Sequence, residues 1–203
     1  MADRVTARDE GSKFLPHPEG QYAAQCVDVV NLGERVEQYL DKPKKLVPKV
    51  AIVFQTGERN AETGELHQVS VEFTVSMGDK ANLRKFLEQW RGKTYTDEQA
   101  EAGVPIDKLE GQLGLITVER KKAKGSGNLY ATIKVICPLP KGMGAPTLPV
   151  YVRPDFWEER KKANATAAAV FRQESHPVGN GESNDFDDFP PPHDDDSDQS
   201  LPF

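Results

Sequence analysis

The chain of 203 residues has few of the side chains that build metal sites or disulfide frameworks. It holds two cysteines, Cys26 and Cys137, and both lie in apolar runs typical of strands, so we expect reduced packing residues. None of the four histidines has a metal-ligand spacing. The sequence therefore predicts neither a metal nor a cofactor.

Long apolar segments are also absent. No run approaches the roughly 18 residues that cross a bilayer. The charged start MADRVTARDEGSKF lacks the apolar core of a signal peptide. We therefore expect a cytoplasmic protein, with no membrane partner.

The motifs of common enzymes are missing as well. There is no phosphate-binding glycine loop of the Walker or Rossmann type and no G-x-S-x-G elbow. Gly125-Ser126-Gly127 is too short for a phosphate loop and lies in a predicted hairpin. We expect a protein that is not an enzyme. A phosphodiester-cleaving enzyme, with carboxylates brought together only by the fold, remains an alternative.

Charge is divided unevenly along the chain. Residues 172–203 carry nine acidic residues and one basic residue, a net charge of -8, whereas residues 1–171 carry +2. Residues 172–203 are also rich in Pro, Gly, Ser and Asn, which predicts a disordered acidic tail. Residues 1–13 predict a mobile leader. Such asymmetry favours a body that binds nucleic acid and an arm that binds partners.

Hydrophobic patterns in the body predict strands separated by turns. In the third strand, Val69, Val71 and Phe73 alternate with polar residues, which is typical of a half-buried strand. Residues 34–48 are polar and hold two prolines, so we expect a long loop there. The five predicted strands cover residues 23–33, 49–57, 67–77, 112–124 and 128–140.

Two helices are expected. The first has an apolar stripe, with Asp79 as its cap and Gly92 at its end, and the stripe is formed by Leu83, Phe86, Leu87 and Trp90. The second covers residues 154–171, with Phe156 and Trp157 available to pack it against the sheet.

The order of three strands, one helix and two strands is that of the OB-fold, a small, partly open barrel. We therefore predict an all-β fold with one or two helices, in which residues 14–153 form a five-stranded OB-fold barrel with a helix between strands three and four. The alternatives are another small α+β sheet or an SH3-like barrel.

Basic residues gather with tyrosines in the two loops that flank the binding groove of OB-folds. Lysine and arginine follow phosphates, and rings stack on unpaired bases, so this composition favours single-stranded DNA. The alternative is that each loop is only a solvated turn. The candidate residues are Arg35, Tyr39, Lys42, Lys44, Lys45 and Lys49 in the first region, and Arg120, Lys121, Lys122, Lys124, Tyr130 and Lys134 in the second.

The final ten residues, DDDSDQSLPF, end an acidic run with an apolar tip. This pattern resembles the tip of bacterial single-stranded DNA-binding proteins, with Leu201 in place of the more usual isoleucine. In that family the tip docks into basic-rimmed apolar pockets on replication, recombination and repair enzymes. The resemblance implies the same docking role here for Asp194, Asp195, Asp196, Asp198, Leu201, Pro202 and Phe203. The alternative is a tail that only solubilises.

Stretches of the body, FLPHPEGQY and MGDKANLRKFLEQWRGK among them, resemble small proteins that tailed bacteriophages encode near replication and recombination genes. The resemblance implies a phage-encoded single-stranded DNA-binding protein in the host cytoplasm. It would coat single-stranded DNA and recruit replication and recombination proteins through its tail. A protein-interaction adaptor or a DNA mimic is the alternative.

Overall fold

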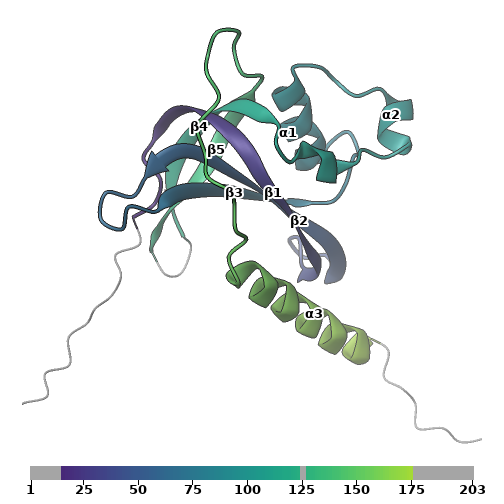
Figure 1. The fold of residues 1–203 in the computed structure, drawn as a ribbon. Coiled ribbons are helices and arrows are strands. Elements are labelled where there is room, and N and C mark those ends of the chain that lie inside the picture. The colour runs from purple at the N-terminus through teal and green to yellow at the C-terminus, as the bar shows by residue number, and fades with distance from the viewer. Residues whose placement is uncertain (1–14, 124–126, 176–203) are drawn as a thin grey trace, which may run out of the picture.

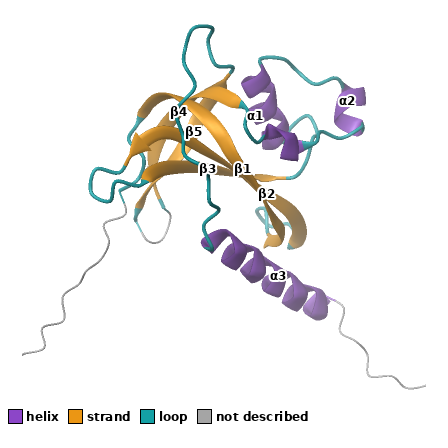
Figure 2. Ribbon diagram, in the orientation of Figure 1, coloured by secondary structure: helices purple, strands orange, loops and turns teal. Residues whose placement is uncertain are grey.

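The structure is a computed structural model that describes residues 15–123 and 127–175. Figures 1 and 2 show a twisted sheet with a helical segment at one end and a long helix on one side. The predicted leader, Lys124 and most of the predicted tail, including its tip, lie outside the described residues.

The strands are β1 (Gly20–Glu37), β2 (Lys45–Arg59), β3 (Leu66–Thr74), β4 (Leu113–Lys122) and β5 (Leu129–Cys137). The helices are α1 (Asn82–Arg91), α2 (Asp97–Glu101), the 3₁₀ turn η1 (Ile106–Leu109) and α3 (Phe156–Ser175).

The described strands form one antiparallel sheet in the order β3-β2-β1-β4-β5. The long strand β1 serves two ladders, because its first part pairs with β4 and its second part pairs with β2. The sheet is open, and its two edge strands, β3 and β5, contact each other. The predictions of a mostly β fold and five strands are confirmed, as is that of a helix between the third and fourth strands.

The prediction of a long loop at residues 34–48 was wrong. The ladder between β1 and β2 continues to the pair Glu37 and Lys45, so the connection spans only residues 38–44. Pro48 fits in this ladder opposite Glu34, and its carbonyl accepts a hydrogen bond from the Val75 N–H at 2.9 Å. Proline lacks a backbone donor but keeps its acceptor, so it is tolerated where the acceptor alone is used.

The main core lies between the sheet and α1. Leu83, Phe86, Leu87 and Trp90 are all buried, as their spacing predicted. They pack with inward residues of the strands such as Phe54. The Trp90 Nε1–H donates to the Leu113 carbonyl at 2.8 Å, so the ring is satisfied as well as buried. This helix closes one end of the sheet (Figure 1).

Of the two predicted ends of α1, the C-terminal end is confirmed and the N-terminal cap is not. Gly92 ends the helix in the left-handed conformation, with φ of 67°, as predicted. The N-cap is Ala81, which makes no side-chain capping bond, so the prediction of an Asp79 cap was wrong. Asp79 instead accepts a hydrogen bond from Arg84 at 2.6 Å. The physical reason is position: a turn closed by the Ala81 N–H and the Gly78 carbonyl at 2.8 Å precedes the helix, so Asp79 lies two residues before the N-cap.

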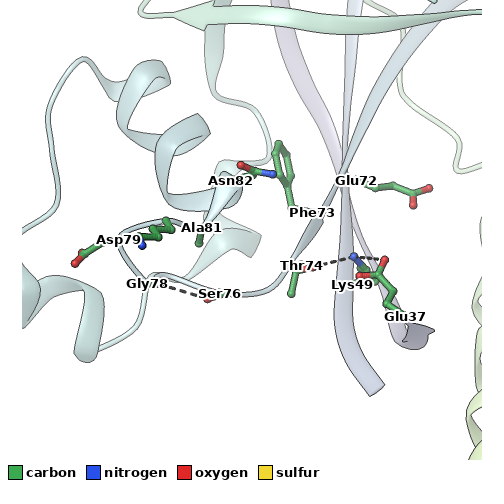
Figure 3. A pocket seen from close by; sticks show the side chains of 11 residues that line it. Glu37, Lys49, Glu72, Phe73, Thr74, Ser76, Gly78, Asp79, Ala81 and Asn82 are labelled. Carbon is green, nitrogen blue, oxygen red and sulfur yellow. Dashed lines mark hydrogen bonds and ion pairs between the residues drawn. The ribbon is translucent and has the colours of Figure 1, made fainter. Parts of the chain in front are cut away.

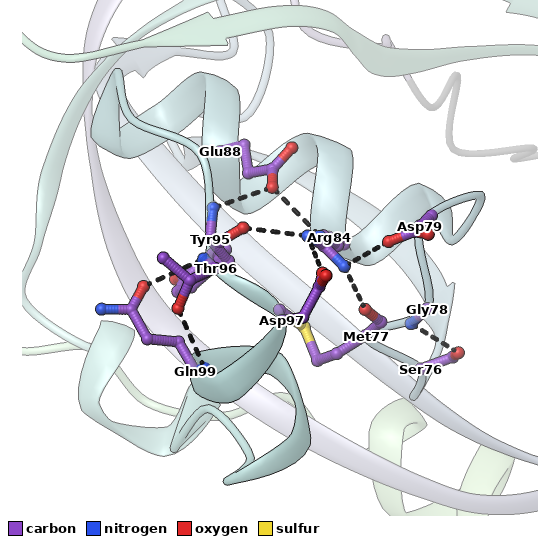
Figure 4. A network of polar contacts seen from close by, with 10 residues as sticks. All are labelled: Ser76, Met77, Gly78, Asp79, Arg84, Glu88, Tyr95, Thr96, Asp97 and Gln99. Carbon is purple, nitrogen blue, oxygen red and sulfur yellow. Dashed lines mark hydrogen bonds and ion pairs between the residues drawn. The ribbon is translucent and has the colours of Figure 1, made fainter.

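Arg84 organises the segment around α1 and α2 (Figure 4). Its guanidinium donates to Asp79 and Glu88 and to the backbone carbonyls of Met77 and Tyr95. Arg84 therefore ties the residues before α1 to those that follow it.

The long helix α3 covers the opposite face of β1 and β2. Trp157 is fully buried there among apolar side chains that include Val30, Ala51 and Val53. Phe156, its neighbour, remains 44% exposed, so only one of the two predicted anchors packs. The helix continues to Ser175, four residues beyond the expected boundary at 171. Arg153, just before the helix, contacts Asp28 of β1, and α3 itself contacts Leu32 and Glu34 through Asn164 and Arg172.

Candidate nucleic-acid interface

The two basic regions predicted from the sequence are hairpins near opposite ends of β3. The β1–β2 hairpin lies near the end of β3, where Lys49 pairs with Thr74. The β4–β5 hairpin lies near its start, because Arg120 donates to the His17 carbonyl and the His17 ring lies 5.2 Å from that of His67. The fold therefore separates the two clusters by the length of one strand.

The β1–β2 hairpin presents cations freely to solvent. Lys42, Lys44 and Lys45 are exposed, and the described residues provide no ion pair for any of them. Tyr39 is 69% exposed in the same turn, beside Leu40, whose φ of 51° is left-handed. A ring and three lysines thus stand together on a tight loop, an arrangement that suits a flexible anionic strand.

Two other cations predicted for this region are already engaged. Lys49 is 6% exposed, and its ammonium donates to Thr74 at 2.8 Å and pairs with Glu37 at 2.6 Å. Figure 3 shows this group beside a hollow lined by Glu37, Glu72 and Asp79. Arg35 bridges Glu37 and Glu72, at 2.8 and 2.9 Å. These contacts fix the base of the hairpin.

Glu37 shows how strongly that base is held. Burial alone would raise the pKa of this carboxyl, but hydrogen bonds from Lys49 and Arg35 outweigh it and lower the pKa below the usual 4.5. Glu37 is therefore ionised at neutral pH and pairs with both cations beside it, Lys49 and Arg35. The carboxylates that line the hollow in Figure 3, Glu37, Glu72 and Asp79, are each paired with a cation.

The β4–β5 hairpin divides its cations in a similar way. The Arg120 guanidinium donates to the carbonyls of Pro16 and His17, both at 2.9 Å, and so holds the N-terminal segment on the sheet. Lys121 pairs with Glu119 at 2.6 Å, and its pKa is raised by that hydrogen bond. Lys122 and Lys134 are exposed. The exposed lysines are the cations of this hairpin best placed for phosphates.

His17 is a buried link between this hairpin and β2, and its ring also lies beside that of His67 on β3. It is 1% exposed, and its Nδ1 and Nε2 lie 2.8 Å from the Pro18 carbonyl and 2.7 Å from Thr56 Oγ1. Burial is the largest influence, and it lowers the pKa of His17 despite the carbonyl contact. The neutral ring donates from Nδ1 to the Pro18 carbonyl and accepts at Nε2 from the Thr56 hydroxyl, so His17 holds the N-terminal segment in place.

Tyr130 lies in a groove that the sequence did not reveal. The groove has a volume of about 780 Å³ and runs between β5, β3 and the beginning of α3. Tyr130 is 43% exposed on the β5 side, and Phe156 and Arg160 line the α3 side. Polar, uncharged Gln68 and Ser70 of β3 lie between them.

Phe156 and Arg160 are therefore residues that sequence reasoning missed. The available signal was the pair Phe156 and Trp157 at a helix start. Consecutive helical residues point about 100° apart, so only one of two adjacent rings can face the sheet. The other ring has to point along the surface, and here it lines the groove.

Other kinds of site find no support in the described part of the chain. Residues 15–123 and 127–175 contain no cluster of three or more His, Cys, Asp or Glu side chains able to hold a metal ion. Within the same ranges, every helix is too short or too polar to cross a membrane. A scan against protein-family models and a search of curated proteins both gave no match to this chain.

Proposed function

We propose that the protein binds and coats single-stranded DNA during phage replication and recombination, using an OB-fold barrel, and that its acidic tail recruits partner enzymes. The observation that carries the proposal is the position of two lysine-bearing hairpins near the opposite ends of β3, the strand that also lines the groove. A DNA strand laid along β3 would have lysines near both ends of its path and the rings of the groove beside it.

The sheet order supports the OB-fold part of the proposal. Strand β1 is shared between β2 and β4, and α1 lies between β3 and β4, which is the arrangement of a five-stranded OB barrel. Contact between the edge strands β3 and β5 is what a nearly closed barrel requires. The loops that flank the binding groove in that fold correspond to the β1–β2 and β4–β5 hairpins.

Direct titration tests the function. Fluorescent oligo(dT) should bind in a salt-sensitive manner, duplex DNA much more weakly, and neither should be cut in Mg²⁺. Cleavage would favour the phosphodiester enzyme, and binding of proteins alone would favour the adaptor or DNA mimic.

The salt dependence of oligo(dT) binding tests whether the lysines of the β1–β2 hairpin contact phosphates. Replacing Lys42, Lys44 and Lys45 by alanine should reduce the slope of log affinity against log salt by about 2, because each contact with a single strand contributes about 0.7. The matched control replaces the exposed Lys85, Lys93 and Lys108, which are remote in sequence from both hairpins. An equal change in slope for the two triples would show that only net charge matters.

The role of the tail is tested by ending the chain at Ser175. This boundary keeps α3 and its ion pair between Arg172 and Glu34. It removes eight acidic residues and no Lys or Arg, leaving a body with a net charge of +2. The shortened protein should bind oligo(dT) as well as the full chain or more tightly, and it should no longer recruit a replication or recombination enzyme. The reason is that an acidic tail would compete with DNA for the basic residues of the body. Weaker binding of oligo(dT) by the shortened protein would contradict this competition.

A further inference from the structure

The groove between β5, β3 and α3 differs chemically from the two hairpins. No lysine of the described residues lines it, and its lining combines rings, hydroxyls and amides with apolar side chains. Tyr130 on one side and Phe156 on the other are each a little under half exposed. Rings presented in this way are held by the fold yet keep area free for contact.

Of the two carboxylates in this lining, Glu72 is neutralised by two arginines. Glu72 pairs through Oε2 with Arg35 at 2.9 Å and through Oε1 with Arg160 at 2.6 Å. Glu65 is exposed on the loop before β3. The groove thus offers no concentrated positive charge for phosphates and, at Glu72, no unpaired negative charge. Flat, uncharged groups are the part of a nucleic acid that such a surface fits.

We propose that this groove holds the unpaired bases of the bound strand, with Tyr130 and Phe156 as the stacking rings. The inference depends on the proposed function, because the strand has to be bound before its bases can enter. Gln68 and Ser70 lie where they can hydrogen-bond base edges, and the phosphates remain toward the lysines of the hairpins. A volume of about 780 Å³ lies within the range of pockets that bury drug-sized ligands.

A polypeptide strand is the less suitable occupant. Peptides that extend a sheet need a free edge with open backbone groups. The exposed edges of β3 and β5 face and contact each other, which leaves no room for a further strand between them. The groove is instead reached from the outside, where its rings are exposed.

The test compares oligo(dT) with an abasic strand of the same length and charge. Tyr130→Leu and Phe156→Leu should each weaken oligo(dT) binding about 5- to 150-fold, the loss expected when one base loses its stacking ring. Neither substitution should change the affinity for the abasic strand. Tyr130→Phe and Phe156→Tyr keep the rings and should retain binding.

Two further variants serve as matched controls. Val135→Ala lies on the same strand as Tyr130, and Val170→Ala lies on the same helix as Phe156; both residues are exposed to a similar degree and lie outside the groove lining. Neither control should weaken binding. Thermal unfolding should show that all variants remain folded at the temperature of the assay, since none of the substituted side chains belongs to the buried core.

The outcomes separate the two proposals. If the parent protein binds neither strand, the proposed function fails. If it binds oligo(dT) in a salt-sensitive manner but both leucine variants bind equally well, the function stands and the base groove is wrong. That second result is the one expected of a groove that serves a polypeptide. An equal loss on the abasic strand would also overturn the base-groove inference, because the rings would then act without bases.

Discussion

The helices α1 and α3 attach to the sheet by different physical means. Helix α1 has ten residues and buries four large apolar side chains in the main core. Helix α3 has twenty residues but buries only Trp157 and Ala168. Length therefore says little about attachment, because the apolar area that a helix removes from water supplies most of its docking energy.

Polar contacts supply the rest of the attachment of α3. Arg153, just before the helix, makes two hydrogen bonds to the buried Asp28 carboxylate, at 2.5 and 2.7 Å. Asn164 donates to the Leu32 carbonyl at 2.9 Å, and Arg172 pairs with Glu34. The comparison predicts that α1 unfolds with the cooperative core, whereas α3 can separate while the sheet stays folded.

The largest expected effect is on the α1 side. Trp90→Ala should lower the free energy of unfolding by about 3–5 kcal/mol, because it leaves a cavity against Phe54 and Phe86. It also removes the donor that satisfies the Leu113 carbonyl. Urea unfolding followed by circular dichroism measures the change. A cost below about 1 kcal/mol, the size of a surface effect, would show that α1 is not part of the core.

Trp157→Ala tests the other helix and should have a smaller global effect. The loss is limited to about 1.5–3 kcal/mol, the value of burying one large apolar side chain, because α3 can detach without unfolding the sheet. Hydrogen exchange should show α3 losing protection while β2 and α1 keep theirs. Loss of protection throughout the chain would instead make α3 an integral part of the core.

The ion pair between Asp28 and Arg153 allows a second test of whether α3 detaches as one unit, because the effects of Arg153→Met and Trp157→Ala should then be coupled. Arg153→Met would leave the Asp28 carboxylate, which is 3% exposed, without its counter-ion. Detachment of the segment returns that carboxylate to water, so the cost cannot exceed the docking energy of α3. The double variant with Trp157→Ala should therefore cost little more than the larger single change. Strict additivity of the two free energies would contradict docking as one unit.

Sequence patterns found those elements whose burial follows their own periodicity. The alternation through Val69 and Phe73 and the stripe ending at Trp90 predicted a strand and a helix that the structure confirms. The β1–β2 hairpin was missed because polar residues and Pro48 conceal a ladder that depends on its partner strand. Pairing is a tertiary property, and local composition does not carry it.

The candidate interface divides in the same way. Exposed Lys42 and Tyr39 could be selected from composition alone, since charge and rings on a turn are visible in the sequence. The engagement of Lys49 by Glu37 and the groove that joins Tyr130 to Phe156 depend on residues distant along the chain. A local sequence pattern does not show which distant residues come into contact, so such contacts become visible only in the folded structure.

The polar face of α1 should make stability depend on pH, through the Glu88 carboxylate. Hydrogen bonds from the Tyr95 N–H at 2.9 Å and from Arg84 lower the pKa of Glu88 below its usual 4.5 (Figure 4). A depressed pKa gives stability that is complete above pH 4.5 and is lost as the pH falls through the folded-state value. Glu88→Gln should therefore unfold with a shallower dependence on pH between 5 and 3. Glu101→Gln, on exposed α2, is the control and should keep the parent slope.

The smallest expected effect is at the far end of α3. Arg172 and Glu34 are both exposed, and a pair of this kind contributes only about 0.2–1 kcal/mol, less in salt. Arg172→Ala should leave global unfolding nearly unchanged and increase hydrogen exchange only in the last turns of α3. The difference from the parent should shrink in 1 M NaCl, where the charges are screened. A difference that persists at high salt would mean that the arginine stem, rather than its charge, holds the helix end against β1.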